Sequence, residues 1–233
     1  QRSTLFPYTT LFRSYARFLA ARHGLDRPAS GPAALTAALE RLVGCPLPAS
    51  DLFDAILPAR VRDFRAWDLD QLSAEGALLW TGVEAIGPDD GRIAFYGVEQ
   101  FSALAPPARP LAAEAEVHRR IRDVLRERGA CFFAELARRV GGFEADALEA
   151  LWDLVWAGEV TNDTLSPLRS RLFKAKAGRS AEHRRAVSFR ARQAGPPGSE
   201  GRWSLLVRDP VSPTLRGVAA SEMFLSRFGV VTR

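Results

Sequence analysis

The side chains with the clearest chemical potential are cations gathered in one segment of the chain. Residues 169–192 hold one acidic residue against nine basic ones: Arg169, Arg171, Lys174, Lys176, Arg179, Arg184, Arg185, Arg190 and Arg192. The segment therefore carries +8, whereas the whole 233-residue chain carries +5, so the remainder is net negative. Such groups neutralise phosphates and release counterions, which gives affinity for nucleic acid without sequence preference. The alternative is a solvated linker whose charge has no partner.

One aromatic residue is a candidate to add a stacking surface to these cations. Trp152 and Trp156 stand one helical turn apart, and Trp152 belongs to an apolar stripe, which indicates a role in the core. Trp156 lies off the centre of that stripe. We therefore expect Trp156, rather than Trp152, to stack on a base.

No pattern for catalysis or for a metal accompanies the cations. A P-loop ends in Gly-Lys-Ser/Thr, whereas both lysines of this chain, Lys174 and Lys176, are followed by Ala. Cys45 and Cys131 stand outside any CxxC spacing, which predicts two buried thiols in a reducing cytoplasm. We expect no catalytic residue, metal or cofactor in this chain. No apolar run approaches the length that spans a bilayer.

The elements that position the cations begin with an amphipathic helix. Leu148, Leu151, Trp152 and Val155 follow the i, i+3, i+4, i+7 spacing of a buried helical stripe. Gly158 ends that helix, a β-favouring run starts at residue 159, and a turn is expected at residues 162–164. Residues 160–165 and 202–207 are predicted to pair as a β-hairpin wing, with the basic segment as its greatly extended loop.

The same order of elements stands upstream. Helical segments are predicted at residues 32–43, 49–57 and 69–72, followed by β-strands at 78–82 and 92–97 around a Pro-Asp-Asp-Gly turn. In the second unit, residues 114–128 and 131–140 precede the helix at 148–156. Two units of this order predict an α+β, mainly helical fold of tandem winged-helix modules with small hairpin wings.

The predicted domain organisation covers the whole chain. Residues 1–14 are expected to be disordered, because residues 4–14 (TLFPYTTLFRS) resemble a translated sequencing adapter. The other predicted parts are the end of a preceding module (15–29), module 1 (30–106), module 2 (107–212, with a basic wing loop at about 169–200) and the start of a third module (213–233).

Several collinear motifs carry a family resemblance. They are LPARVRDF at residues 57–64, LWTG at 79–82, DGRIAFY at 90–96, LWDLVWAGEVTNDTLSPLR at 151–169 and GRWSLL at 201–206. With this series the chain, from about residue 15 to its end, resembles the region C-terminal to the motor in Lhr, the large helicase-related superfamily 2 ATPases. The resemblance implies a piece of an ATP-dependent DNA helicase linked to DNA repair, with ATP and Mg²⁺ bound by upstream motor domains.

The resemblance also implies partners and leaves alternatives open. The expected partners are DNA, single-stranded or in a DNA-RNA hybrid, and the upstream helicase domains of the same cytoplasmic protein; no membrane is expected. The piece itself is expected to have no activity, and hydrolysis would belong to the parent. A stand-alone winged-helix transcriptional regulator is one alternative. Part of a winged-helix DNA glycosylase-like region is another, since some members of the family have such C-terminal regions.

Overall fold

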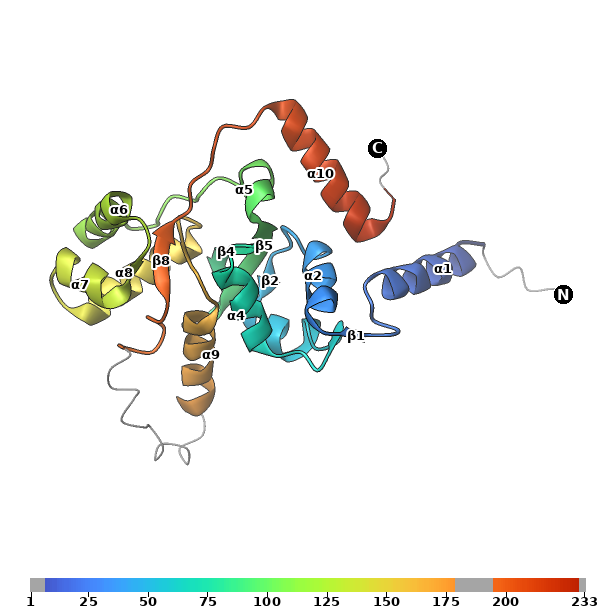
Figure 1. Ribbon diagram of the computed structural model, residues 1–233, viewed down its shortest axis with the longest axis horizontal. Coiled ribbons are helices and arrows are strands. Elements are labelled where there is room, and N and C mark those ends of the chain that lie inside the picture. The colour runs from blue at the N-terminus through green and yellow to red at the C-terminus, as the bar shows by residue number, and fades with distance from the viewer. Residues whose placement is uncertain (1–6, 179–194, 231–233) are drawn as a thin grey trace.

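The computed structural model describes residues 7–178 and 195–230, with side chains for residues 10–173 and 195–230. Two winged-helix modules, each with a three-stranded sheet, lie side by side in one α+β body (Figure 1). The predicted fold class is therefore confirmed. A short parallel pair, β1 (Ala29–Ser30) with β3 (Val61–Arg62), is added at the edge of the first module.

Module 1 follows the helix, strand, helix, helix, hairpin order of a winged helix. Its elements are α2 (Pro32–Glu40), β2 (Leu47–Pro48), α3 (Ala49–Asp51) continued by the π-helical η1 (Leu52–Ile56), β3, α4 (Ala66–Ala74), β4 (Leu78–Ala85), β5 (Gly91–Gly97) and α5 (Val98–Leu104). The antiparallel sheet has the order β2-β5-β4. Asp90 fixes the wing turn, because its carboxylate accepts the Ser50 hydroxyl at 2.6 Å and the Gly91 amide at 2.8 Å.

Module 2 repeats this order and inserts a helix into its wing. Its elements are α6 (Glu116–Arg128), β6 (Cys131–Phe132), α7 (Phe133–Val140), α8 (Glu144–Trp156), β7 (Val160–Asn162), α9 (Ser166–Gly178) and β8 (Arg202–Leu205). The predicted pairing of the two wing segments is confirmed, with Val160 opposite Leu205 and Asn162 opposite Trp203, but the strands are shorter than the predicted 160–165 and 202–207. The predicted loop is wrong at its start, because residues 166–178 form a helix. Leu, Arg, Lys and Ala, which dominate this stretch, all have high helix propensity.

One hydrophobic core runs through both modules. It joins Leu69, Trp80 and Phe95 of module 1 to Ile121 and Trp203 of module 2. The predicted stripe of α8 lies in this core: Leu148, Leu151, Trp152 and Val155 are all at most 6% exposed. Burying apolar surface between the modules stabilises both at once. The two winged helices therefore form one packed unit.

The terminal helices α1 (Pro7–Arg22) and α10 (Pro213–Phe228) lie on the module 1 side of the molecule (Figure 1). Because α1 begins at Pro7, the expectation of disorder over residues 1–14 is wrong for residues 7–14. Helix α10 packs over α5 and α2 and has no buried residue. Its assignment to a third module stays a prediction. None of the helices in the described ranges is long and apolar enough to cross a membrane.

Candidate nucleic-acid interface

The third helix of module 2 is covered by the wing of module 1. Helix α8 packs against β4 so closely that a Cβ atom at Gly82 would lie 2.2 Å from the carbonyl oxygen of Val155. At Gly91 a Cβ atom would lie 2.4 Å from the ring of Trp156. In helix-turn-helix proteins this helix enters the major groove. In this chain one face of α8 packs in its own module and another packs against β4, so neither face is free to enter a groove.

Trp156 belongs to this contact between the modules. Its ring lies 5.3 Å from that of Trp152, against Gly91 of the wing, and it is partly buried. Trp152 in turn stacks edge-to-face on Trp203, and its Nε1 donates to the Gly198 carbonyl at 3.0 Å. The expectation that Trp156 offers a free stacking surface does not fit this placement, because wing backbone already covers its ring.

The first turns of the basic helix α9 are fastened to the third helix of module 1. The Asp70 carboxylate on α4 accepts the Leu165 amide at 2.8 Å and both terminal nitrogens of Arg169, one of them at 2.9 Å. The side chains of Asp70 and Arg169 are only 15% and 18% exposed. A bidentate pair of this kind orients the two partners and satisfies the charge of each. Arg169 is thus placed to hold α9, not to meet a phosphate.

Arg171 is likewise used inside the protein. Its guanidinium stacks over the Trp152 ring at 4.8 Å, pairs with Glu149 at 3.1 Å and donates to the Pro88 carbonyl at 2.8 Å. The residue is 8% exposed. Through these contacts Arg171 ties α9 to α8 and to the wing turn of module 1. Phosphate binding by this side chain would require it to leave all three partners.

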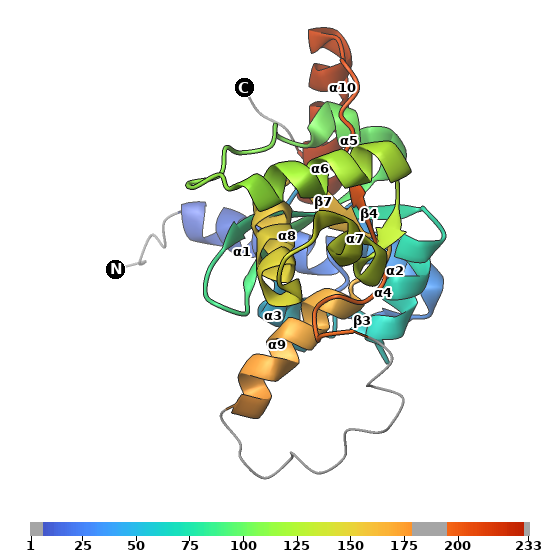
Figure 2. The ribbon, with the colours of Figure 1, turned by 90° about the vertical axis from the view of Figure 1, so that its left-hand side faces the viewer.

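The other predicted phosphate contacts lie further along the insertion. Lys174 and Lys176 belong to the backbone of α9, but their side chains are outside the described part of the chain. Five more are outside the described residues altogether: Arg179, Arg184, Arg185, Arg190 and Arg192. Figures 1 and 2 show α9 projecting from the body of the molecule, and Phe173 near its end is 62% exposed. The end of α9 therefore points away from the two modules.

The turn at the start of the second wing is built by polar side chains, as predicted for residues 162–164. The Asn162 side-chain oxygen accepts the Thr164 amide at 2.9 Å, and its nitrogen donates to the Glu200 carbonyl at 2.8 Å. Asp163 pairs with Arg202 at 2.8 Å across the hairpin. The same turn is held to module 1, because Trp80 Nε1 donates to the Asn162 and Thr164 carbonyls. The turn therefore fixes where α9 starts.

The third helix of module 1 bears residues that the sequence reasoning missed. Trp67, in the first turn of α4, is 71% exposed, and Arg62 and Arg65 just before it are also exposed. The apolar stripe of α4 contains Leu69 and Leu72, and Trp67 lies off it. A tryptophan out of phase with its helix's stripe was the available signal, since large aromatic residues usually bury most of their surface.

The described residues show no cluster of His, Cys, Asp or Glu able to hold a metal ion. Cys45 and Cys131 are both free thiols, and burial raises the pKa of Cys131. His118 has a structural role at the start of α6: its Nδ1 accepts the Ala115 amide at 3.0 Å, and its Nε2 lies 3.2 Å from Asp153.

Fold and site together define a fused pair of winged helices, in which a basic insertion is anchored between the two third helices. Residues 12–98 match the family model described as "Large helicase-related protein, winged-helix domain". The chain belongs to the Lhr family.

Two relatives show how much of such a protein the chain represents. The "Lhr helicase/uracil glycosylase" of Escherichia coli (strain K12) is 34% identical over 257 residues, covering 94% of this chain and 16% of the relative. The "Lhr helicase/ probable uracil glycosylase" of Mycolicibacterium smegmatis is 34% identical over 236 residues, covering 94% and 15%. The chain thus spans about one sixth of the length of these relatives.

Proposed function

We propose that this chain is an accessory nucleic-acid-binding region of an Lhr-type ATP-dependent DNA helicase that acts in DNA repair. ATP and Mg²⁺ would be bound by motor domains elsewhere in the same protein. The winged helices would hold single-stranded DNA, or a DNA-RNA hybrid, and brace the motor. The similarity to two proteins named Lhr helicase supports this assignment.

The observation that carries the proposal is the anchoring of a strongly basic segment beside module 1. Arg169 and Arg171 hold the start of α9 against α4 and α8. The seven later cations, from Lys174 to Arg192, follow this anchored start directly in the sequence. Because backbone phosphates are alike in all sequences, phosphate contacts by these cations would give affinity without sequence preference.

A second candidate function rests on the names of the relatives, both of which include uracil glycosylase. In that case the chain would deliver DNA to a glycosylase region elsewhere in the protein. Binding that prefers uracil-containing strands over matched thymine-containing strands would favour this role. Equal affinity for the two would favour the helicase role alone.

The test is the salt dependence of binding, measured by fluorescence anisotropy with labelled single strands, duplexes and DNA-RNA hybrids. If seven cations contact phosphates, log Kobs should fall with log[salt] with a slope of about −5 for single strands or about −6 for duplex. Substituting Arg184, Arg185, Arg190 and Arg192 with Gln should lower the slope by about 3 for single strands. A slope near zero for the unaltered protein would contradict the proposal.

A matched control removes the same charge from other surfaces. Arg13, Arg17, Arg138 and Arg216 are exposed, and none forms an ion pair with another described residue. The quadruple Gln variant at these positions has the same net charge as the variant in the basic segment. If both variants weaken binding equally, general charge rather than the anchored segment attracts the nucleic acid.

A further inference from the structure

The segment that leads into α4 alternates between anchored and outward-facing residues. Val61 is buried, Phe64 packs against the core and Leu69 is fully buried. Between them Arg62, Arg65 and Trp67 are exposed. Because the three apolar side chains fix the backbone, the three exposed ones are presented by a rigid support. Preorganised groups of this kind lose little freedom on binding.

Among the described residues, none of the three exposed side chains takes part in an ion pair or a ring contact. Neither Arg62 nor Arg65 forms an ion pair with a described residue, whereas Arg119, Arg122 and Arg126 on α6 are all paired. Trp67 is 71% exposed, while Trp80, Trp152 and Trp203 are at most 1% exposed. Two unpaired guanidinium groups next to an uncovered indole suit a ligand with phosphates and a flat ring.

The backbone between the two arginines is also unusual. Asp63 has a φ of 59°, the only positive φ of a non-glycine residue in the described part of the chain. Such conformations cost free energy and gather at binding sites. Here the turn ends β3 and leads the chain into α4, so that Arg62 and Arg65 flank it.

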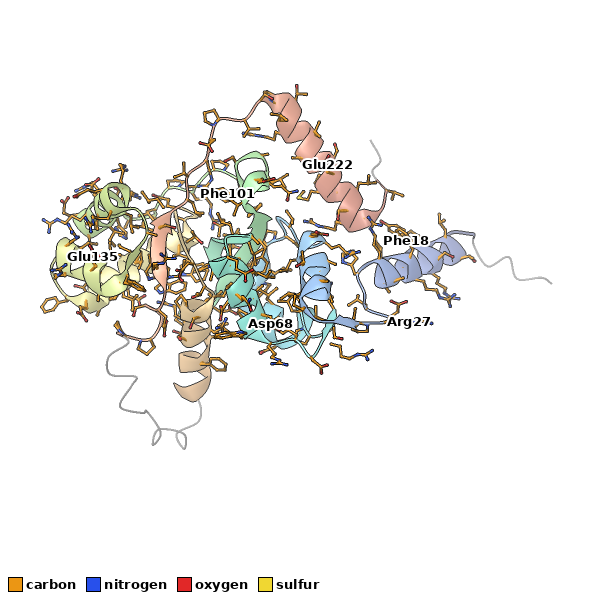
Figure 3. All side chains as sticks on the ribbon, viewed as in Figure 1. Phe18, Arg27, Asp68, Phe101, Glu135 and Glu222 are labelled. Carbon is orange, nitrogen blue, oxygen red and sulfur yellow. The ribbon has the colours of Figure 1, made fainter. Side chains whose placement is uncertain are left out.

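Trp67 lies beside the anchor of the basic segment. It is three residues before Asp70, which binds Arg169 and the Leu165 amide, and residues at this spacing neighbour each other on a helix. Asp68, in the same turn, lies in the lower part of module 1, beside α9 in the view of Figure 3. Trp67 therefore lies on the same helix as the carboxylate that anchors the start of α9.

We propose that Arg62, Arg65 and Trp67 form a binding site for single-stranded nucleic acid, with an unpaired base stacked on Trp67 and neighbouring phosphates on the two arginines. This inference rests on the proposed function and narrows its substrate to strands with unpaired bases. An unpaired base is required because a base in a duplex has no free face for the indole. Asp63 and Asp68 offset the two positive charges locally. Stacking of a base on Trp67, and not charge alone, would therefore distinguish this site from an ordinary basic surface.

The test measures binding of a fluorescein-labelled oligothymidylate to the full chain. Trp67→Ala should weaken binding about 5- to 150-fold, the loss typical of one base-aromatic stack, and Trp67→Phe should restore most of it. Arg62→Gln with Arg65→Gln should lower the single-strand salt slope by about 1.4. Phe143→Ala is the matched control, because Phe143 is 81% exposed in module 2. Duplex binding should not change on substitution of Trp67.

Intrinsic fluorescence gives a second, independent readout. An unlabelled oligothymidylate should quench the emission of the exposed Trp67, and this quenching should be absent in Trp67→Phe. If the unaltered protein binds strands but Trp67→Ala binds as well as Phe143→Ala, this inference is overturned and the proposed function stands. If the unaltered protein binds no oligonucleotide at any salt concentration, the proposed function itself is wrong.

Discussion

Asp70 makes the ionic contact between the start of α9 and the third helix of module 1. Its carboxylate receives a backbone amide and a bidentate guanidinium from a segment nearly one hundred positions away in sequence. Both ionic side chains are mostly buried, so each needs the other to compensate for lost hydration. The pair therefore determines the orientation of α9 on module 1 as much as the stability of the fold.

We predict that Asp70→Asn lowers the free energy of unfolding by about 3 kcal/mol, the lower end of the range for removing one partner of a buried pair. The remaining Arg169 would be left with an unmatched charge. Urea unfolding measures the change, and a double-mutant cycle with Arg169→Gln isolates the coupling. Asp123→Asn is the control: its pair with Arg126 is exposed and should contribute at most about 1 kcal/mol. Equal losses in the two variants would contradict this role for Asp70.

His23 lies at the junction of the terminal helices α1 and α10. Its Nε2 lies 3.0 Å from the Arg227 carbonyl at the end of α10, and Arg22 donates to the Leu225 and Ser226 carbonyls of the same turn. Burial lowers the pKa of His23 below its ordinary value of 6.5. The hydrogen bond to the Arg227 carbonyl opposes this shift, whereas the nearby charges of Arg60, Arg41 and Arg22 add to it. The folded state therefore favours the neutral ring.

The sign of the pH effect follows from proton binding. Just below pH 6.5 the unfolded chain binds a proton at His23 more readily than the folded chain, so stability should fall as the pH drops through this value and be fully present above it. Urea unfolding between pH 8 and 5.5, compared with His23→Gln, measures the difference. Parallel curves for the two proteins would show that His23 does not couple folding to pH.

At the scale of elements, the contact of β4 with α8 requires glycine. At Gly82 the backbone of β4 approaches the Val155 carbonyl of α8 too closely for any Cβ atom. We predict that Gly82→Ala separates the strand from the helix and costs about 1 to 3 kcal/mol, as other forms of overpacking do. Thermal unfolding measures this loss.

Gly87→Ala serves as the control for Gly82→Ala. A Cβ atom at Gly87, in the turn of the same wing, would have nothing within 4 Å. Its effect should stay within about 0.5 kcal/mol. If the two alanine variants unfold alike, the close approach of β4 to α8 does not limit stability.

The elements themselves were largely predictable, because their signals are local. The stripe of Leu148, Leu151 and Trp152 predicted a buried helix, and Gly158 predicted its end at the correct place. Helix α9 was not predicted, because its residues were interpreted by their charge and not by their helix propensity. The contacts of Gly82 with Val155 and of Asp70 with Arg169 had no local signal. They join segments that only the packed modules bring together, so residue spacing could not place Arg169 in an ion pair.

At the scale of the whole molecule, the two modules differ in what they leave uncovered. Module 2 buries its third helix against the wing of module 1, whereas module 1 presents the first turn of its own third helix, with Trp67, to solvent. The basic insertion starts between them. A tandem repeat has thus become asymmetric: module 2 supplies the base of the insertion, and module 1 supplies the neighbouring open surface.

The shared core predicts that the modules unfold together. Ile121 of α6 is fully buried in the core that also contains Trp80 and Phe95 of module 1. Ile121→Ala should lower the free energy of unfolding by about 2 to 5 kcal/mol. If unfolding is one cooperative event, the free energy of exchange of those β4 and β5 amides that exchange only by global unfolding should fall by the same amount. Hydrogen exchange on the variant measures this, with Val207→Ala, at a 72% exposed position, as the control. Unchanged exchange in β4 and β5 would mean that the modules fold independently despite their common core.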